Sequence, residues 1–409
     1  MIFVPLSRSK SLRMALWAFV VVTLTMLTAQ AEFTIDTEFP GGNVTVEGIE
    51  GDTIRLAPDN RDSTVPWFYW NFAVRGAAGK TLQFVLSPRV IGVHGPGIST
   101  DGGKSWKWLG ADAVKEGVFS YTFPAGANDV RFSVGMPYVT ADFLRFMEKY
   151  KGNPNVQMGV LTKSPKDREV PLIKIGAPGR KAPYAIAVTG RHHASEMMGS
   201  YVIEGIIQGA LADDAQGKWL RDNVDFFIVP FVDYDGVEDG DQGKNRAPHD
   251  HNRDYAETPI YPEVAAIKEQ VPAWSAGRPL IFIDVHDPAL KGDIHEVIQF
   301  LAPQEGKQAE QLDRLAALVE MNNQGPIIFR SSMIMKFGVA YNGIVAVPPP
   351  ISSGWARTLP NTLFGVSLEM PYANTGGCEV NSTSAREFGH DIAWGLKAYL
   401  KEVSETKSN

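Results

Sequence analysis

The chain has 409 residues, which is enough for two domains and at least one large hydrophobic core. Its formal charge of −7 disfavours nucleic acid as a partner, because nucleic-acid-binding proteins usually carry a basic face. Cys378 is the only cysteine, which excludes an intrachain disulfide and a multi-cysteine zinc site.

Residues 1–31 have the pattern of a signal peptide. Three basic residues precede a short apolar run, which ends in the small-x-small sequence Ala-Gln-Ala. An uncleaved membrane anchor is the alternative, but the run is short and interrupted by threonines, which favours cleavage. We therefore expect a periplasmic or secreted protein that has no membrane contact after cleavage.

Residues 32–136 are rich in short, alternating runs separated by glycine. "NVTVEGIEGDTIRL", "KTLQFVLS" and "DVRFSVG" are examples, and together they predict an all-β sandwich domain. Aromatic residues such as Trp67, Tyr69 and Phe72 are expected to fill its core, with a ligand platform as the alternative.

Residues 137–409 have a different texture. "YAIAVTG", "DFFIVPFVD", "PLIFIDVHD" and "LFGVSLEMPY" are apolar runs typical of strands buried on both faces. Helical patterns separate them, and the last helix has a capping-box pattern at Ser384 and Glu387. The prediction is an α/β domain, in which helices cover both faces of a mixed sheet.

Two strand ends carry residues suited to binding a metal. His193 and Glu196 follow the first run and are three residues apart, so both side chains can point to one place. His286 ends the third run and completes a set of two histidines and one glutamate. Such a set leaves a coordination position open for water, which is typical of catalytic zinc. His192 competes with His193, but the residue three positions later, Ser195, does not suit zinc.

Two further strand ends carry charge. Glu369 ends an apolar strand, where an ionised carboxylate needs a cationic partner or a task in proton transfer. The stretch "NRAPHDHNRD" follows the second run and contains Arg246 and Arg253, whose forked donors suit carboxylates or an oxyanion. Because the carboxyl ends of strands form the binding edge of an open α/β sheet, we expect the four segments to converge.

These segments, in this order, resemble the zinc metallocarboxypeptidases of the carboxypeptidase A superfamily. The resemblance is strongest to the cytosolic-carboxypeptidase-like branch, which carries a β-sandwich before the catalytic domain. It rests on "DNRDSTVPWFYWNFAVRG", "MPYVTADF", "VPFVDYDGVEDG" with "KNRAPHDHNRD", and "SLEMPYANTGG". It covers nearly all of the chain after the signal.

The resemblance implies a role for each matching position. One Zn²⁺ per chain would be bound by His193, Glu196 and His286, and Glu369 would act as general base and then as acid. Asn252 and Arg253 would hold the terminal carboxylate of the substrate, and Arg246 would stabilise the oxyanion. His249 and His251 match no ligand and are interpreted as loop or substrate-contact residues. For the family's substrate-clamping tyrosine, Tyr341 is a candidate with loose spacing.

The function that follows is an exported zinc carboxypeptidase, which acts on peptides that have a free C-terminal carboxylate. A cell-wall peptide amidase, an N-acyl amino acid deacylase and an inactive binding protein are the alternatives. Arg357 lies twelve residues before Glu369, in the stretch expected to line the pocket for the terminal side chain. It predicts a preference for an acidic terminal residue. The alternative is that Arg357 points to solvent from a proline-rich loop.

Overall fold

The computed structural model describes residue 1, residues 33–338 and residues 351–408. The signal peptide predicted at residues 1–31 and Tyr341 fall outside the parts described in detail. Within the described ranges, no helix combines the length and the apolar character that are needed to cross a membrane.

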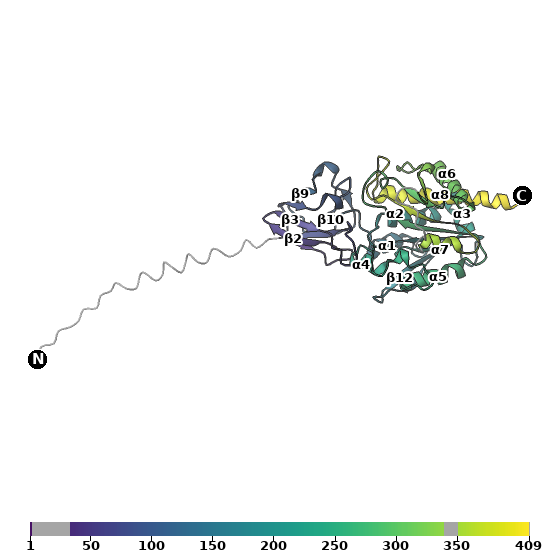
Figure 1. Ribbon diagram of the computed structural model, residues 1–409, viewed down its shortest axis with the longest axis horizontal. Helices are drawn as coiled ribbons and strands as arrows, with labels where there is room; N and C mark the ends of the chain where they lie inside the picture. The colour runs from purple at the N-terminus through teal and green to yellow at the C-terminus, as the bar shows by residue number, and fades with distance from the viewer. Residues whose placement is uncertain (2–32, 339–350, 409) are drawn as a thin grey trace.

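Two five-stranded sheets form the N-terminal part of the molecule (Figure 1). The first contains, in spatial order, β1 (Thr34–Asp36), β4 (Asn71–Arg75), β10 (Asp129–Ser133), β6 (Gly97–Ser99) and β7 (Lys107–Trp108). The second contains β2 (Thr45–Glu50), β3 (Thr53–Ala57), β5 (Thr81–Val85), β9 (Val118–Thr122) and β8 (Val114–Lys115). Neighbouring strands are antiparallel except for the parallel pair β3 and β5. The predicted all-β region that precedes the α/β part of the chain is confirmed.

Aromatic side chains from both sheets form the core of this region. Phe72 and Phe132 come from the first sheet, and Phe84 and Phe119 come from the second. The ring centroids of Phe84 lie 5.0 Å from Phe119, 5.1 Å from Phe132 and 5.6 Å from Phe72. All four side chains are buried, as is Tyr69, so the predicted core role is confirmed for Phe72 and Tyr69. The predicted core role of Trp67 is wrong, because its side chain is only partly buried and lines a cleft.

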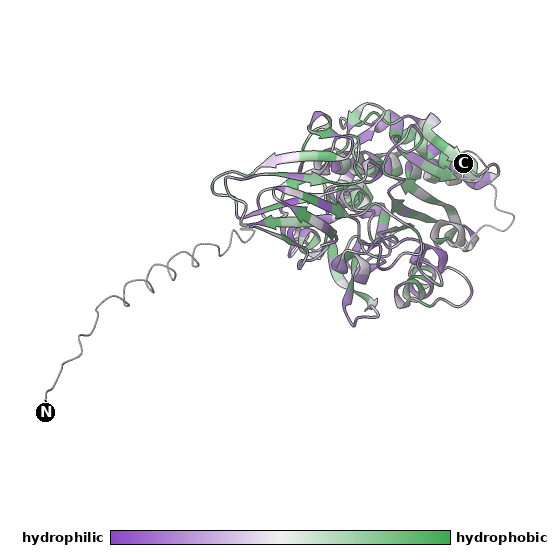
Figure 2. Ribbon diagram, turned by 60° about the vertical axis from the view of Figure 1, so that its left-hand side comes forward, coloured by the Kyte–Doolittle hydropathy of each residue, from purple (hydrophilic) through white to green (hydrophobic). Residues whose placement is uncertain are grey.

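The second part of the chain is built on an eight-stranded mixed sheet. Its spatial order is β11 (Val156–Lys163), β12 (Glu169–Ile175), β14 (Val224–Val229), β13 (Tyr184–Gly190), β15 (Leu280–His286), β18 (Thr362–Glu369), β16 (Gln299–Ala302) and β17 (Ile334–Lys336). The four central strands, β14, β13, β15 and β18, are parallel. On either side of them, β12 is antiparallel to β14, and β16 is antiparallel to β18. β13 and β15 are buried along their whole length, and the central strands are green in Figure 2. This explains why they read as continuous apolar runs.

Helices cover this sheet, as predicted. α2 (Met198–Leu211) and α6 (Lys307–Asn322) pack against the long C-terminal helix α8 (Ser382–Ser408), and α5 (Pro262–Ser275) lies on the opposite side in Figure 1. The other helices are α1 (Thr140–Met147), α3 (Ala215–Asn223), α4 (Tyr234–Asp239) and α7 (Ser352–Thr358). Short 3-10 turns are η1 (Pro88–Val90), η2 (Ala111–Ala113), η3 (Glu148–Tyr150), η4 (His251–Arg253) and η5 (Ser331–Met333), and a small hairpin joins β19 (Asn374–Thr375) to β20 (Cys378–Glu379).

The predicted capping box of the last helix is wrong. Helix α8 begins at Ser382, so Ser384 lies inside its first turn. Asn381 is the capping residue, because its side-chain oxygen accepts hydrogen bonds from the backbone amides of Thr383 and Ser384 at 2.9 and 3.0 Å.

Candidate metal centre and adjoining cleft

Three parallel neighbours, β13, β15 and β18, bring the candidate residues to one edge of the sheet. The turn after β13 carries His193 and Glu196, β15 ends at His286, and β18 ends at Glu369. In the register of β15 and β18, His286 lies directly opposite Glu369. The expected convergence of these strand ends is therefore confirmed.

Glu196 lies between the two histidines. Its Oε1 is 3.0 Å from Nδ1 of His193, and its Oε2 is 2.7 Å from Nδ1 of His286. One ligand atom from each residue can be chosen so that all three lie within 4.8 Å of one another, and all three side chains are buried. Two imidazole nitrogens and one carboxylate are a donor set that suits Zn²⁺ and leaves a position open. His193, Glu196 and His286 are the candidate zinc ligands, as predicted.

Each candidate histidine has a carboxylate near its second nitrogen. Nε2 of His286 is 2.6 Å from Oδ2 of Asp284, and Nε2 of His193 is 3.5 Å from Oδ1 of Asp250. Such partners fix the orientation of a ligating imidazole and raise its basicity. In each histidine, the carboxylate lies near Nε2, and Nδ1 faces Glu196.

His192 forms a second candidate group with Asp284 and His286. Both of its nitrogens already have partners, since Nδ1 is 2.8 Å from Asp284 and Nε2 is 2.7 Å from the hydroxyl of Tyr255. The hydroxyl of Thr189 also contacts Asp284, at 2.8 Å. These contacts make His192 a residue that positions Asp284, in agreement with the choice of His193 as the ligand.

Glu369 lies beside the ligands but makes few contacts. Its Oε2 is buried and has no hydrogen-bond partner within the described part of the chain. Burial raises the pKa of Glu369, although the neighbouring His286 opposes this shift. A buried carboxyl group with an unused oxygen is suited to proton transfer. Its role as general base stays a prediction.

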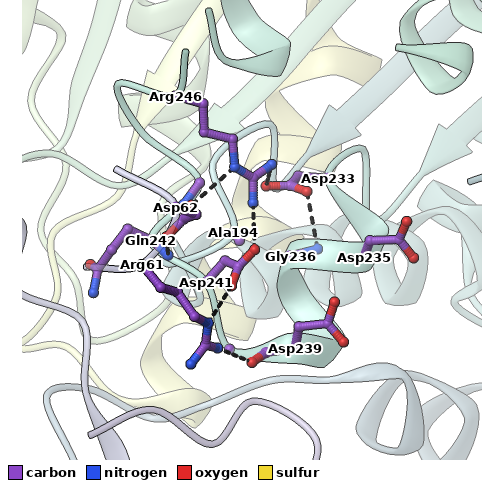
Figure 3. Close-up of polar contacts among 12 residues, drawn as sticks. Arg61, Asp62, Ala194, Asp233, Asp235, Gly236, Asp239, Asp241, Gln242 and Arg246 are labelled. Atoms are coloured by element: carbon purple, nitrogen blue, oxygen red, sulfur yellow. Dashed lines mark hydrogen bonds and ion pairs between the residues drawn. The ribbon is translucent and has the colours of Figure 1, made fainter. Parts of the chain in front are cut away.

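Arg246 is bound by three carboxylates (Figure 3). Its Nε is 3.0 Å from Asp62, one terminal nitrogen is 2.7 Å from Asp233, and the other is 2.9 Å from Asp241. Every nitrogen of the guanidinium group is therefore engaged away from the three metal ligands. The predicted oxyanion role of Arg246 is not tested by this geometry, but the structure assigns it a different set of partners.

Lys244, which the sequence interpretation missed, is a cation that contacts the candidate ligand Glu196. Its Nζ is 2.6 Å from Oε1 of Glu196, and its side chain is 16% exposed. Burial opposes its charge, yet Glu196 and Glu369 raise the pKa of Lys244 above its usual value. The sequence did offer one indication of such a role, because Lys244 lies between the end of a buried strand and the two arginines.

A cleft of about 430 Å³ adjoins the metal centre. It is lined by Thr64, Trp67, His193, Lys244, Asn245, Arg246, Pro248, His249, Asp250 and Arg253. Arg253 is exposed, and its guanidinium donates one long hydrogen bond of 3.5 Å to the carbonyl of Asn252. It is thus placed to bind an anion that enters the cleft.

Asn252 is committed to other contacts. Its side-chain nitrogen is 3.3 Å from Nε2 of His286, and its oxygen accepts a hydrogen bond from the amide of Ser352 at 3.0 Å. Neither His249 nor His251 belongs to a metal-binding group found in the described ranges. His249 contacts Asp254 at 2.7 Å, which agrees with its interpretation as a loop residue that lines the cleft.

Arg357 lies in α7 and is not among the residues that line this cleft. It donates a hydrogen bond of 3.2 Å to the carbonyl of Gly365, and its guanidinium lies 5.0 Å from the ring centroid of Phe337. Burial lowers the pKa of Arg357 to about 10. Its part in selecting the terminal residue stays a prediction.

Comparison with known proteins agrees with this arrangement. Residues 143–270 match the family profile described as zinc carboxypeptidase. The match covers less than half of the chain and includes His193, Glu196 and Arg253, whereas His286 and Glu369 lie outside it.

Curated relatives also match only part of the chain. An uncharacterized protein of Zymomonas mobilis is 26% identical over 233 residues, which are 54% of this chain and 59% of that protein. Cytosolic carboxypeptidase 2 of Danio rerio is 28% identical over 142 residues, which are 32% of this chain and 20% of that protein. The chain thus spans at most 59% of the length of these two relatives.

Solved structures show the same fold over most of the chain. A metallo-carboxypeptidase from Burkholderia cenocepacia has a TM-score of 0.76 at 17% identity, with 91% of this chain and 100% of that chain covered. A metallo-carboxypeptidase from Pseudomonas aeruginosa, in complex with (2-guanidinoethylmercapto)succinic acid, has a TM-score of 0.71 at 20% identity, with coverages of 90% and 99%. These likenesses show that the chain shares the fold of the two metallo-carboxypeptidases, while residues 143–270 are similar to zinc carboxypeptidases and the chain is distantly similar to cytosolic carboxypeptidases.

Proposed function

We propose that the protein is a metallocarboxypeptidase of the zinc carboxypeptidase family, which hydrolyses the last peptide bond of peptides with a free C-terminus. The observation that carries this proposal is the position of His193, Glu196 and His286 beside a cleft that also contains the exposed Arg253. Zinc held by these three residues would supply Lewis acidity, which polarises a carbonyl and acidifies water.

The residues of the chain divide the remaining tasks. Arg253 pairs with the terminal carboxylate of the substrate and places the last peptide bond near the ligands. Asn252, which is bonded to Ser352 and faces His286, keeps the turn with Arg253 in position. Glu369 takes a proton from the attacking water and passes it to the leaving amine.

Export is a separate part of the proposal. It is supported by the signal-like pattern of residues 1–31, in which basic residues precede an apolar run and a small-x-small site. The substrates would then be peptides in the periplasm or outside the cell.

The test uses one peptide in two forms, with a free or an amidated C-terminus, before and after treatment with a chelator. We expect the zinc-loaded protein to release the last amino acid from the free acid alone, and the chelator to stop the reaction. Arg253→Ala should lower kcat/KM for the free acid about a hundredfold or more, because a charge-assisted, forked pair is lost.

Equal cleavage of the free and amidated peptides would contradict the proposal. Activity confined to muropeptides or to N-acyl amino acids would identify an amidase or a deacylase instead. An inert protein in all these assays would favour a binding role.

A further inference from the structure

The family resemblance assigns the oxyanion role to Arg246, whose guanidinium group is held by carboxylates in this structure. All three nitrogens of the guanidinium group contact carboxylates; the side chain of Asp233 is buried, and that of Asp62 is 11% exposed. Movement of Arg246 toward a substrate would leave these carboxylates without their cation in a poorly hydrated place, which is unfavourable. Although Arg246 also lines the cleft, these contacts favour a role for it in holding the loop.

Lys244 places a positive charge next to the candidate metal ligands. Its Nζ is within hydrogen-bond distance of Glu196, one of the three ligands, and it lines the same cleft as His193 and Arg253. A substrate whose carboxylate pairs with Arg253 would lie in the cleft that Lys244 also lines, with its last carbonyl directed toward the ligands that Lys244 contacts. A lysine donates hydrogen bonds as a compact point charge, which suits a single oxyanion.

The N-terminal domain holds Lys244 in place. Nζ lies 4.7 Å from the ring centroid of Trp67, and the indole of Trp67 donates a hydrogen bond of 2.9 Å to the side chain of Asn245. Thr64 binds the carbonyl of Asn245 through its amide and its hydroxyl, at 3.1 and 2.8 Å. These contacts fix the backbone next to Lys244, independently of its ion pair with Glu196.

We propose that Lys244 is the cation that stabilises the oxyanion formed during peptide-bond cleavage, and that Arg246 is a positioning residue; the proposal rests on the proposed function. The oxygen of water bonds to the carbonyl carbon, and the carbonyl π electrons move to the carbonyl oxygen, which Lys244 receives as a hydrogen-bond donor. The proton of the water goes to Glu369. When the carbon–nitrogen bond breaks, the carbonyl re-forms and Glu369 returns the proton to the leaving amine.

A structural alternative is that Lys244 only balances the charge of Glu196. The two roles differ in their effect on zinc binding. If Lys244 held Glu196 in place for the metal, its removal would weaken zinc affinity. If Lys244 serves the oxyanion, its removal leaves zinc affinity unchanged or increases it, because a competing cation next to a ligand is lost.

The experiment compares Lys244→Met and Lys244→Arg with the full-length protein and with Lys104→Met, which changes an exposed lysine of the N-terminal domain. Zinc affinity, peptide hydrolysis and the affinity for a phosphonate analogue of the same peptide are measured. For Lys244→Met we expect zinc binding at least as tight as in the wild type. We expect kcat to fall about a hundred- to a thousandfold with little change in KM, and phosphonate affinity to fall in parallel. Lys244→Arg should recover part of both losses.

Wild-type turnover or wild-type phosphonate affinity in Lys244→Met would overturn the assignment, as would a loss of zinc. A folded Arg246→Met variant that keeps its thermal stability and loses phosphonate binding would return the role to Arg246. If the wild-type protein neither cleaves the peptide nor binds the phosphonate, the proposed function itself fails. If it does both and Lys244→Met matches it, only the inference about Lys244 fails.

Discussion

Asp284 shows how a single side chain decides which atoms are offered to a metal. Its Oδ1 is 2.8 Å from Nδ1 of His192, and its Oδ2 is 2.6 Å from Nε2 of His286. This leaves Nδ1 of His286 for Glu196 and for a metal, and it explains an acidic residue in the middle of a buried strand. A buried carboxylate is tolerated here because it has several partners.

Zinc should be lost when a ligand is removed. His193→Ala and His286→Ala each leave two protein ligands, and a site with two ligands binds zinc weakly. We expect about one zinc per chain in the wild type and little in either variant, measured by elemental analysis after dialysis. Full zinc content in both variants would refute the site, and His390→Ala on helix α8 serves as the control.

Glu369→Gln should separate metal binding from catalysis. The amide has nearly the same shape but cannot accept the proton of water, so the loss of turnover is expected to be about a hundred- to ten-thousandfold. Zinc content and thermal stability should stay close to those of the wild type. Turnover at the wild-type level would assign the base to another residue.

Arg357 should decide the preference for the terminal side chain. Its guanidinium is partly buried and contacts a backbone carbonyl, so an acidic side chain that reaches it gains a charge-assisted pair. We expect kcat/KM to be about tenfold or more higher for a peptide ending in Glu than for one ending in Leu. The preference should disappear in Arg357→Ala, and a wild-type preference for Leu would show that Arg357 does not line the pocket.

Helix α2 keeps the metal turn in place at the scale of secondary structure. The backbone amides of Met198 and Gly199 donate to the carboxylate of Asp287 at 2.7 and 2.8 Å, so the residue after the histidine ligand of β15 holds the start of α2. The two ligand segments are thereby joined through a helix N-terminus, where an acceptor satisfies free amides.

The close contact of α2 with α8 depends on glycine. A Cβ at Gly205 would lie 2.0 Å from the carbonyl oxygen of Arg386, and a Cβ at Gly389 would lie 2.1 Å from that of Val202. We expect Gly205→Ala to lower the free energy of unfolding by about 1–3 kcal/mol or more, because the two helices must separate. Chemical denaturation measures this change.

Gly126→Ala is the matched control, since no other group lies within 4 Å of the Cβ it would gain. It should leave stability nearly unchanged. A Gly205→Ala variant as stable as this control would show that α2 and α8 can move apart without cost.

At the scale of the whole molecule, the N-terminal domain forms one wall of the cleft. Thr64 and Trp67 line it, and Asp62 accepts hydrogen bonds from the amides of Gln242 and Gly243 at 3.0 and 2.8 Å. Asp62 also pairs with Arg246 (Figure 3). The loop that carries Lys244 and Arg246 is therefore shaped by both parts of the chain.

Asp62→Ala should disturb the cleft, although Asp62 is not one of the candidate zinc ligands. Arg246 loses one partner and the loop loses two hydrogen bonds, so we expect a loss of about 2–3 kcal/mol in the free energy of unfolding. We also expect kcat/KM to fall about tenfold or more, because the loop no longer holds the cleft residues in place. Glu47→Ala, at an exposed position of β2, is the control. Equal behaviour of the two variants would show that the domain does not position the loop.

The local pattern of the sequence determined much of the fold and the metal ligands. Two short patterns were enough to predict the ligands and the proposed base. One is an apolar run that ends in His286 or Glu369, and the other is the three-residue spacing of His193 and Glu196. Strand ends and helical turns can be recognised locally in a sequence. Because strands and helices alternate, the carboxyl edge of the sheet was the expected place for these side chains to meet. The first turn of α8 was predicted wrongly because Asn381, one residue before it, offers the better cap.

Only the tertiary structure decided which cation faces the ligands. Arg246 and Lys244 are two residues apart in the same loop, and nothing local distinguishes their tasks. Asp62, which is 184 residues from Arg246 in the sequence, binds one of them, while Glu196 binds the other. The partner of a charged side chain depends on the carboxylates that folding brings near it from distant segments and on how far water is excluded, so spacing along the chain does not determine it.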